Sequence, residues 1–134
     1  MTMLSNEEAA ELVRVAAEAR EHAYAPYSNF KVGAALLGES GRVYGGCNVE
    51  NASYGLTICA ERNAFGAGIV AGERKFRAIA IVSETVSPAT PCGACRQFMV
   101  EFNPQMKVIL AGMSGTQRTH DARDLLPEFF TLRD

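Results

Sequence analysis

The segments AIAIV at residues 78–82 and KVILA at residues 107–111 decide the fold of this 134-residue chain. Each is short and almost wholly apolar, which is the pattern of a strand buried on both faces of a sheet. Between them, Pro91 opens a helical segment of about residues 92–102, and Asn103-Pro104 closes it. Buried strands joined by a helical crossover usually lie parallel, so the sequence predicts a parallel strand pair within an α/β fold.

Further helices and strands are expected on both sides of this unit. Ser5 and Glu8 have the spacing of a capping box, which begins a first helix that ends before Pro26. The other expected elements are two strands at residues 31–37 and 42–45 around a Glu39-Ser40-Gly41 turn, a helix at about 59–70, a weak strand near 117–120 and a short helix ending at Leu126-Pro127. This alternation of helices and strands favours a layered α/β fold.

Composition and charge limit the classes of function. With 48% hydrophobic residues and a net charge of -2, residues 1–134 are expected to form one globular domain without the basic patch that nucleic acid requires. We do not expect the polar N-terminus to be a signal peptide, and no apolar run approaches the roughly 20 residues of a membrane helix. We therefore expect a cytoplasmic protein with no membrane partner, whose four cysteines serve a metal or catalysis rather than disulfides.

Three of the cysteines have the spacing of a metal site. Cys92 and Cys95 lie three residues apart on one face of a predicted helix, and Cys59 lies at the start of another. A helix N-terminus carries partial positive charge, which lowers the pKa of a thiol and favours the thiolate that a metal requires. Three protein ligands leave one position for water, whereas four close a zinc site and make it structural.

The residues taken one at a time leave other interpretations open. A Cys-x-x-Cys pair is commonly redox-active or half of a four-ligand zinc site. Cys47 is the spare cysteine that would close such a site, although we expect it to be a buried, inert thiol that follows a strand. Glu61 alone is an ordinary helix-start acid, and Arg62 and Arg96 alone are solvated charges or members of ion pairs.

Several motifs, in one order along the chain, resemble the zinc-dependent cytidine deaminase family, and in particular its small homotetrameric type. These motifs are APYSNF at residues 25–30, GCNVEN at 46–51, CAER at 59–62, PCGACRQ at 91–97, and LLP at 125–127 followed by aromatics. The resemblance covers nearly the whole chain. It implies a three-layer α/β/α sandwich with a mixed five-stranded sheet, and a homotetramer with active sites at subunit interfaces. It also implies hydrolytic deamination of cytidine and deoxycytidine in pyrimidine salvage.

The same resemblance assigns the chemical roles. Cys59, Cys92 and Cys95 bind one Zn²⁺ per subunit as thiolates. Glu61 moves protons between the attacking water, the pyrimidine ring and the leaving amino group. Three thiolates and one Zn²⁺ sum to a net charge of -1, and Arg62 relieves part of this charge by donating hydrogen bonds to a cysteine sulfur.

The resemblance also implies how the nucleoside is bound. Phe129 adjoins Phe130, so the alignment in this part of the chain leaves open which of the two reaches the neighbouring subunit. The implied roles are Phe30 as a wall of the pyrimidine pocket, Asn48 and Glu50 as partners of the ribose 3′-hydroxyl, the Ala60 backbone as a contact of the ring carbonyl, and Tyr54 and Phe130 as residues that reach a neighbouring subunit's site.

Three other functions fit parts of the sequence. They are deamination of a modified cytosine nucleoside such as an antibiotic, a non-catalytic zinc module that mediates assembly, and a dithiol redox protein. Phe30, Asn48 and Glu50 favour the plain nucleoside, and the lack of a basic groove argues against a polynucleotide substrate. The variant Glu61→Gln separates the enzyme from the zinc module, because only an enzyme has turnover to lose.

Overall fold

The structure, a computed structural model, describes residues 3–85 and 87–132. Within these residues the chain forms helices and strands close to the predicted positions. They are α1 (Asn6–Arg20), β1 (Val32–Gly38), β2 (Val43–Cys47), the 3-10 helix η1 (Tyr54–Leu56), α2 (Ala60–Val70), β3 (Phe76–Ser83), α3 (Gly93–Phe102), β4 (Lys107–Ala111), β5 (Gln117–Asp121) and the 3-10 helix η2 (Ala122–Leu125).

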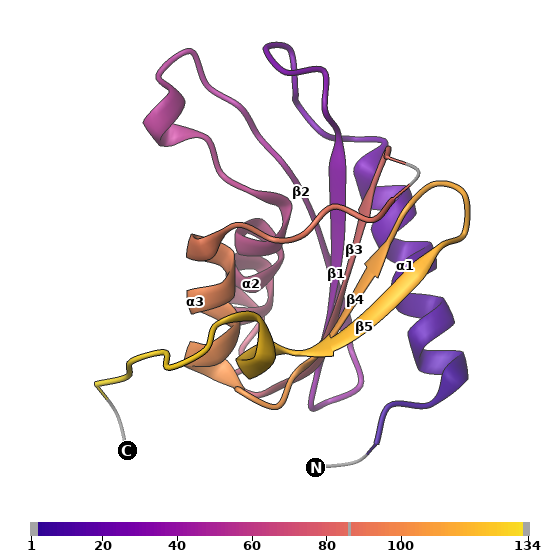
Figure 1. Ribbon diagram of the computed structural model, residues 1–134, viewed down its shortest axis with the longest axis vertical. Helices are drawn as coiled ribbons and strands as arrows, with labels where there is room; N and C mark the ends of the chain where they lie inside the picture. The colour runs from indigo at the N-terminus through magenta and orange to yellow at the C-terminus, as the bar shows by residue number, and fades with distance from the viewer. Residues whose placement is uncertain (1–2, 86, 133–134) are drawn as a thin grey trace.

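These strands form one mixed sheet in the order β2-β1-β3-β4-β5 (Figure 1). β3 and β4 are parallel, with Ala78 opposite Lys107 and Val82 opposite Ala111, which confirms the predicted parallel pair. The remaining neighbours are antiparallel. β1 lies between β2 and β3, so β2 runs in the same direction as β3 without pairing with it.

Helices cover both faces of the sheet, α1 on one face and α2 with α3 on the other (Figure 1). Successive side chains of β1 alternate between the two layers. Ala34 and Leu36 pack in the cluster under α2 and α3, whereas Ala35 and Leu37 pack in the cluster under α1. The fold is therefore the three-layer α/β/α arrangement that the family resemblance implied.

The start of α1 follows its sequence signal, but its end is set by distant residues. Ser5 Oγ accepts a hydrogen bond from Glu8 N, and Glu8 Oε1 accepts one from Ser5 N, both at 3.0 Å, which completes the predicted capping box. The helix ends at Arg20, well before the proline that the sequence suggested as its limit. It stops there because the chain turns to pair with a loop after β2, where Tyr24 N donates to Asn48 O at 3.0 Å.

Gly46 in β2 allows α2 to lie directly on the sheet. A Cβ atom at this position would lie 2.4 Å from Ala60 O and 2.5 Å from Ala64 N, so no side chain fits. Ala60 is the first residue of α2. The close approach therefore fixes the N-terminal end of α2, where Cys59 and Glu61 lie.

Phenylalanine rings hold α2, α3 and β3 together. The centroid of the Phe65 ring in α2 lies 5.5 Å from that of Phe76 in β3 and 5.3 Å from that of Phe102 in α3. The first pair meets edge to face and the second is stacked, both favourable arrangements of aromatic rings. This packing keeps α2 and α3 side by side, so their N-termini lie at the same end of the helical layer that they form.

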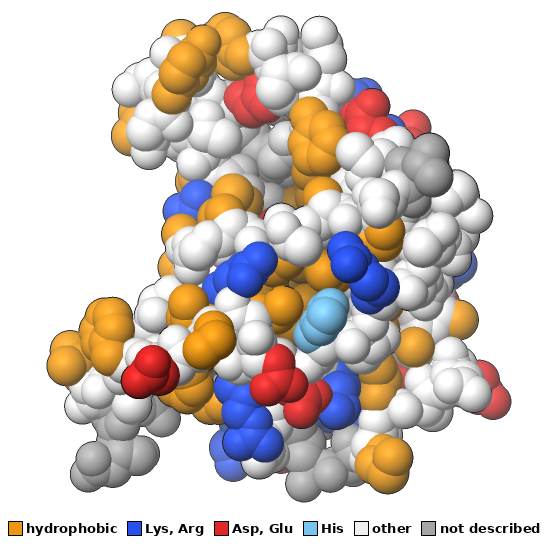
Figure 2. All heavy atoms as spheres, viewed as in Figure 1, with side chains coloured by type: hydrophobic (Ala, Val, Ile, Leu, Met, Phe, Trp, Pro, Cys, Tyr) orange, Lys and Arg blue, Asp and Glu red, His pale blue; other side chains and the backbone are white. Residues whose placement is uncertain are grey.

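The surface drawn in Figure 2 carries acidic and basic side chains next to one another, rather than a continuous basic stripe. An ion pair joins Lys107 Nζ to Asp121 Oδ1 at 2.6 Å between the neighbouring strands β4 and β5. In the part of the chain that the structure describes, no helix is long and apolar enough to cross a bilayer.

Candidate active site

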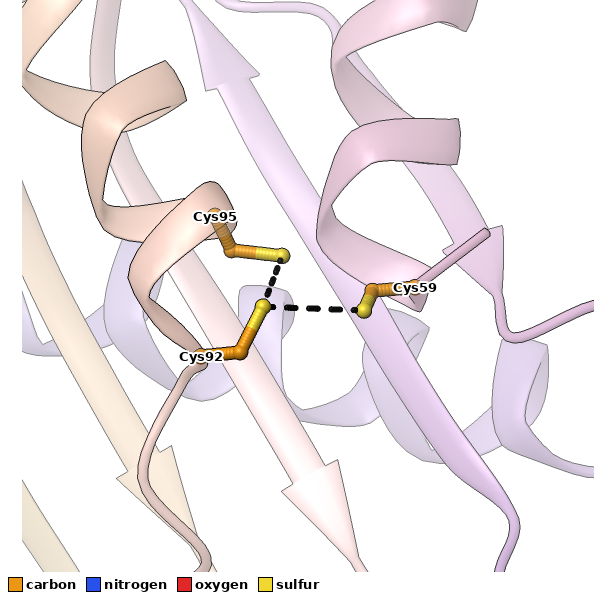
Figure 3. Close-up of side chains that lie close together, drawn as sticks. All are labelled: Cys59, Cys92 and Cys95. Atoms are coloured by element: carbon orange, nitrogen blue, oxygen red, sulfur yellow. Dashed lines mark hydrogen bonds between the residues drawn. The ribbon is translucent and has the colours of Figure 1, made fainter. Parts of the chain in front are cut away.

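Three cysteine sulfurs meet where the N-termini of α2 and α3 lie side by side (Figure 3). Cys59 is the N-cap of α2, Cys92 is the N-cap of α3, and Cys95 lies in the first turn of α3. The Sγ atom of Cys92 lies 3.8 Å from that of Cys59 and 3.5 Å from that of Cys95. The structure thus confirms that both cysteine motifs sit at helix N-termini and that they converge.

The separations of the sulfurs fit a zinc ion. Ligand sulfurs at about 2.3 Å from a tetrahedral centre lie about 3.8 Å from one another. Among the described residues, the group of metal-ligating side chains brought together consists of Cys59, Cys92 and Cys95, with all ligand atoms within 4.8 Å. Cys47, which the sequence predicted to be a buried thiol, is half-buried at the end of β2 and lies outside this group. Three side-chain ligands leave the fourth position open, as in catalytic zinc sites.

The surroundings of the sulfurs shift the pKa values of Cys59 and Cys95 in opposite directions. Hydrogen bonding with Cys95, together with the guanidinium of Arg62, lowers the pKa of the Cys59 thiol to about 5. The pKa of Cys95 is raised, first because its proton is shared with the Cys59 sulfur and then because it is buried. The two thiols therefore titrate as a pair, in which the first proton leaves readily and a bound cation displaces the second.

Arg62 makes the contact that the family resemblance implied. Its Nη2 atom donates hydrogen bonds to Cys59 Sγ and to Thr57 O, each at 3.5 Å. The guanidinium places a positive charge beside the thiolates and holds the loop that precedes α2. It therefore offsets part of the negative charge that three thiolates would bring to the site.

We expect Arg62→Ala to keep its fold and to lower kcat by about 10-fold to 100-fold. Without the guanidinium the sulfurs become more basic, which makes the metal that they bind a weaker Lewis acid. The effect is measured from steady-state kinetics alongside circular dichroism and zinc content. Arg123→Ala removes an exposed arginine elsewhere and serves as the control. An unchanged kcat in Arg62→Ala would show that the contact with Cys59 has no part in turnover.

Glu61 is the second residue of α2, and its side chain is buried, with 5% of its surface exposed. Burial raises the pKa of this carboxyl group, and the charge on Cys59 raises it further. Hydrogen bonding with Cys95 and the charge of Arg62 act in the opposite direction. A carboxyl group held beside the sulfurs with a raised pKa is suited to accept and return a proton.

The family model described as "Cytidine and deoxycytidylate deaminase zinc-binding region" matches residues 6–112 of the chain. The chain belongs to the cytidine deaminase family. Within this family, the three converging cysteines are the zinc ligands, so Cys59, Cys92 and Cys95 bind zinc.

Members of the family resemble the chain over most of its length. The crystal structure of cytidine deaminase from Burkholderia pseudomallei is 56% identical and superposes with a TM-score of 0.88, covering 90% of this chain and 98% of that one. Cytidine deaminase of Halalkalibacterium halodurans is 50% identical over 92% of this chain and 94% of its own length. Cytidine deaminase of Sporosarcina psychrophila is 48% identical over 92% of this chain and 91% of its own length.

The residues expected to bind ribose lie beside the zinc site of this family member. Val49 and Ile58 exchange two backbone hydrogen bonds of 2.9 Å each. Asn48 and Glu50 flank Val49, and Cys59 follows Ile58. The isolated bridge therefore sets the segment that carries the expected ribose-binding pair directly against the segment that leads into α2.

Asn48 also fixes the position of Phe30. The buried side-chain amide of Asn48 accepts a hydrogen bond from Val32 N at 2.9 Å and donates one to Phe30 O at 2.8 Å. The half-buried Phe30 is thereby held just before β1, which begins at Val32. A contact between Asn48 and ribose would use the second lone pair and the second N–H of the amide.

Ser28 organises the carboxylate of Glu50, a role that no sequence signal indicated. Glu50 Oε1 accepts from Tyr27 N at 2.9 Å and from Ser28 N at 3.1 Å, and Ser28 Oγ donates to Oε2. These bonds, led by that of the Ser28 hydroxyl, lower the pKa of Glu50 and keep it an ionised acceptor. Ser28 Oγ also accepts from Phe30 N at 3.0 Å. A serine in a turn is common, so its type alone carried no information.

Tyr54 and Phe130 both project into solvent, with 77% and 68% of their surfaces exposed. Tyr54 lines a cavity of about 210 Å³ that also includes Glu50. Phe129 packs against the core, so Phe130 is the outward-facing member of the pair. In Figure 1 the loop with η1 and the C-terminal segment leave the body far apart. Phe130 is not among the described residues that line the cavity with Tyr54.

Proposed function

We propose that this protein catalyses the zinc-dependent hydrolytic deamination of cytidine and deoxycytidine to uridine and deoxyuridine, with release of ammonia, in pyrimidine salvage. The observation that carries the proposal is the group of three cysteine sulfurs beside the buried carboxyl group of Glu61. The named relatives at about half identity, all cytidine deaminases, support it.

Bound zinc supplies a Lewis acid that lowers the pKa of a water molecule. Glu61 accepts a proton from the attacking water and delivers it to the N3 atom of the pyrimidine ring, while the water oxygen forms a bond to C4. Glu61 then moves the remaining hydroxyl proton to the amino group at C4. The C4–N bond breaks, ammonia leaves and the C4 carbonyl forms. One carboxyl group serves both steps because it alternates between base and acid.

The chain's own polar groups offer partners for the nucleoside. Ala60 is the first residue of α2, and a backbone N–H in the first turn of a helix has no intrahelical acceptor, so it is available to the ring carbonyl. Phe30 would form the wall of the pyrimidine pocket. Glu50, held ionised by Ser28, would accept a hydrogen bond from the ribose 3′-hydroxyl, and Asn48 would add a donor and an acceptor.

The proposed assembly is a homotetramer whose sites are completed across subunit interfaces. Hydrophobic side chains gather at the two tips on the left edge of Figure 2, where Figure 1 shows the loop with η1 and the C-terminal segment. Tyr54 and Phe130 are the residues we expect to reach a neighbouring site. Contiguous exposed apolar patches often mark contact surfaces between proteins. Light scattering should give four times the mass of the chain.

A purely structural zinc module needs a fourth protein ligand. The described residues place three ligands together, with Cys47 outside the group. The proposal therefore favours an open site and an enzyme. None of the four cysteines, all of which are described, forms a disulfide, which fits the reducing cytoplasm as the proposed location.

The direct test is an ultraviolet assay of cytidine and deoxycytidine with and without a zinc chelator. We expect conversion to uridine and deoxyuridine with stoichiometric ammonia, loss of turnover after chelation and recovery when Zn²⁺ is returned. Absence of turnover in the zinc-loaded protein, or undiminished turnover after zinc has been removed, would contradict the proposal.

A further inference from the structure

Arg96 connects the loop that carries a zinc ligand to the C-terminal segment. It directly follows Cys95 in α3 and is half-buried. Its Nε atom donates to Pro91 O at 2.8 Å, and its Nη1 atom donates to Leu125 O at 2.6 Å. Across residues 3–85 and 87–132, no carboxylate forms an ion pair with this guanidinium. Arg96 is thus neither a solvated charge nor half of an ion pair, the two interpretations that its sequence position suggested.

The Pro91 carbonyl belongs to the peptide group that leads into Cys92. Cys92 has an exposed side chain, so it receives little support from packing, unlike the buried Cys95. Its backbone is extended, with φ -71° and ψ 168°, and it directs the sulfur toward the other two ligands. The bond from Arg96 to the preceding carbonyl therefore limits rotation of the peptide that aims the Cys92 sulfur.

The second partner of Arg96 is itself anchored. Leu125 is the last residue of η2, and its side chain packs partly against the core cluster under α2 and α3. The next residue of α3, Gln97, donates from Nε2 to Phe130 O at 3.2 Å. Arg96 and Gln97, which directly follow the zinc ligand Cys95, thus hold the C-terminal segment at Leu125 and Phe130. This gives Arg96 a rigid support on the side away from the zinc loop.

We propose that Arg96 is a positioning residue that braces the Cys92 ligand against the C-terminal segment. The planar guanidinium can direct two N–H groups to two separate carbonyls at once, which a single ammonium group does less well. Zinc ligands are held by such outer contacts, and losing one typically weakens metal binding or activity about 10-fold to 100-fold. The inference rests on the zinc site and not on the identity of the nucleoside.

The test compares zinc release from the intact, zinc-loaded protein in Arg96→Met and Arg96→Lys. We expect transfer of zinc to a chromogenic chelator to be about 10-fold faster or more in Arg96→Met and intermediate in Arg96→Lys. For cytidine, kcat should fall by a similar factor while KM stays within about 2-fold, because the substrate contacts are untouched.

Arg74→Met is the matched control. Arg74 also donates to two backbone carbonyls, Ile69 O at 3.0 Å and Glu73 O at 2.7 Å, but at the far end of α2. The variant Arg74→Met should release zinc at the wild-type rate. Wild-type zinc release from folded Arg96→Met, or equal acceleration in Arg74→Met, would overturn the proposal. If Arg96→Met does not fold, Arg96→Lys decides: faster release supports the brace and wild-type release rejects it. Zinc release is measured independently of turnover. A failed deaminase assay would therefore contradict the proposed function without contradicting the proposed role of Arg96.

Discussion

Glu61→Gln is expected to lower kcat for cytidine by about 10³-fold or more while the protein keeps one zinc ion per chain. General acid–base groups typically contribute 10²-fold to 10⁴-fold, and here one carboxyl group is asked to make both proton transfers. Glutamine has nearly the same size, so the buried position in α2 stays filled. Its amide can neither accept nor release a proton near neutral pH. The proton transfers should therefore be slowed while the metal site stays intact.

Glu7→Gln provides the matched control for this variant. Glu7 is also an acid in the first turn of a helix, but it is exposed and belongs to α1. It should keep wild-type kcat, because an acid that only complements the helix dipole contributes to stability and not to proton transfer. If Glu61→Gln kept kcat within about 10-fold of wild type, Glu61 would be the ordinary helix-start acid that its position alone suggests.

Cys92→Ala is expected to lose bound zinc and to have no measurable turnover, whereas Cys47→Ala should keep both. Removing one of three ligands leaves two sulfurs, which is too few for a stable zinc site. Cys92 is exposed and Cys95 is buried, so alanine at position 92 removes a ligand without opening a cavity in the core.

Zinc content is measured by elemental analysis after dialysis against a weak chelator, with circular dichroism to verify the fold. The comparison with Cys47→Ala uses the same substitution at a free thiol outside the sulfur group. Zinc loss from Cys47→Ala would assign Cys47 as a fourth ligand and would make the site structural.

Local signals in the sequence predicted the elements of the fold better than their arrangement. The capping box at Ser5 and Glu8 and the apolar run at residues 107–111 each report on their own neighbourhood, and both were confirmed. The place of β1 between β2 and β3 depends on pairing between residues about 50 apart, such as Ala34 with Ile81. The early end of α1 depends on a bridge to the loop after β2. No local pattern carries such information.

The same distinction applies to the site. The convergence of Cys59, Cys92 and Cys95 was predicted from their spacing and from their positions at helix starts, and the structure confirms it. The contacts of Ser28 and Arg96 were not predicted, although both residues lie in the quoted motifs. Their partners lie 22 and 29 residues away, and Arg96 binds backbone carbonyls, which any residue can supply. A contact with a backbone carbonyl does not require any particular residue type in the partner, so the sequence does not reveal it.

The family resemblance contributed what the physical patterns did not. Spacing alone left a redox pair, a closed zinc site and a catalytic zinc site as alternatives. The structure supplies sulfur separations that fit zinc, and the family match supplies the identity of the metal. The roles of Phe30, Asn48 and Glu50 toward the nucleoside are predictions that rest on the family resemblance.

X-ray absorption at the zinc edge tests the central claim most directly, because it counts the ligand atoms on the ion. The zinc-loaded protein should show three sulfur atoms at about 2.3 Å and one oxygen at about 2.0 Å. Four sulfur atoms around the ion would mean a closed site with no position for water, and would contradict the account.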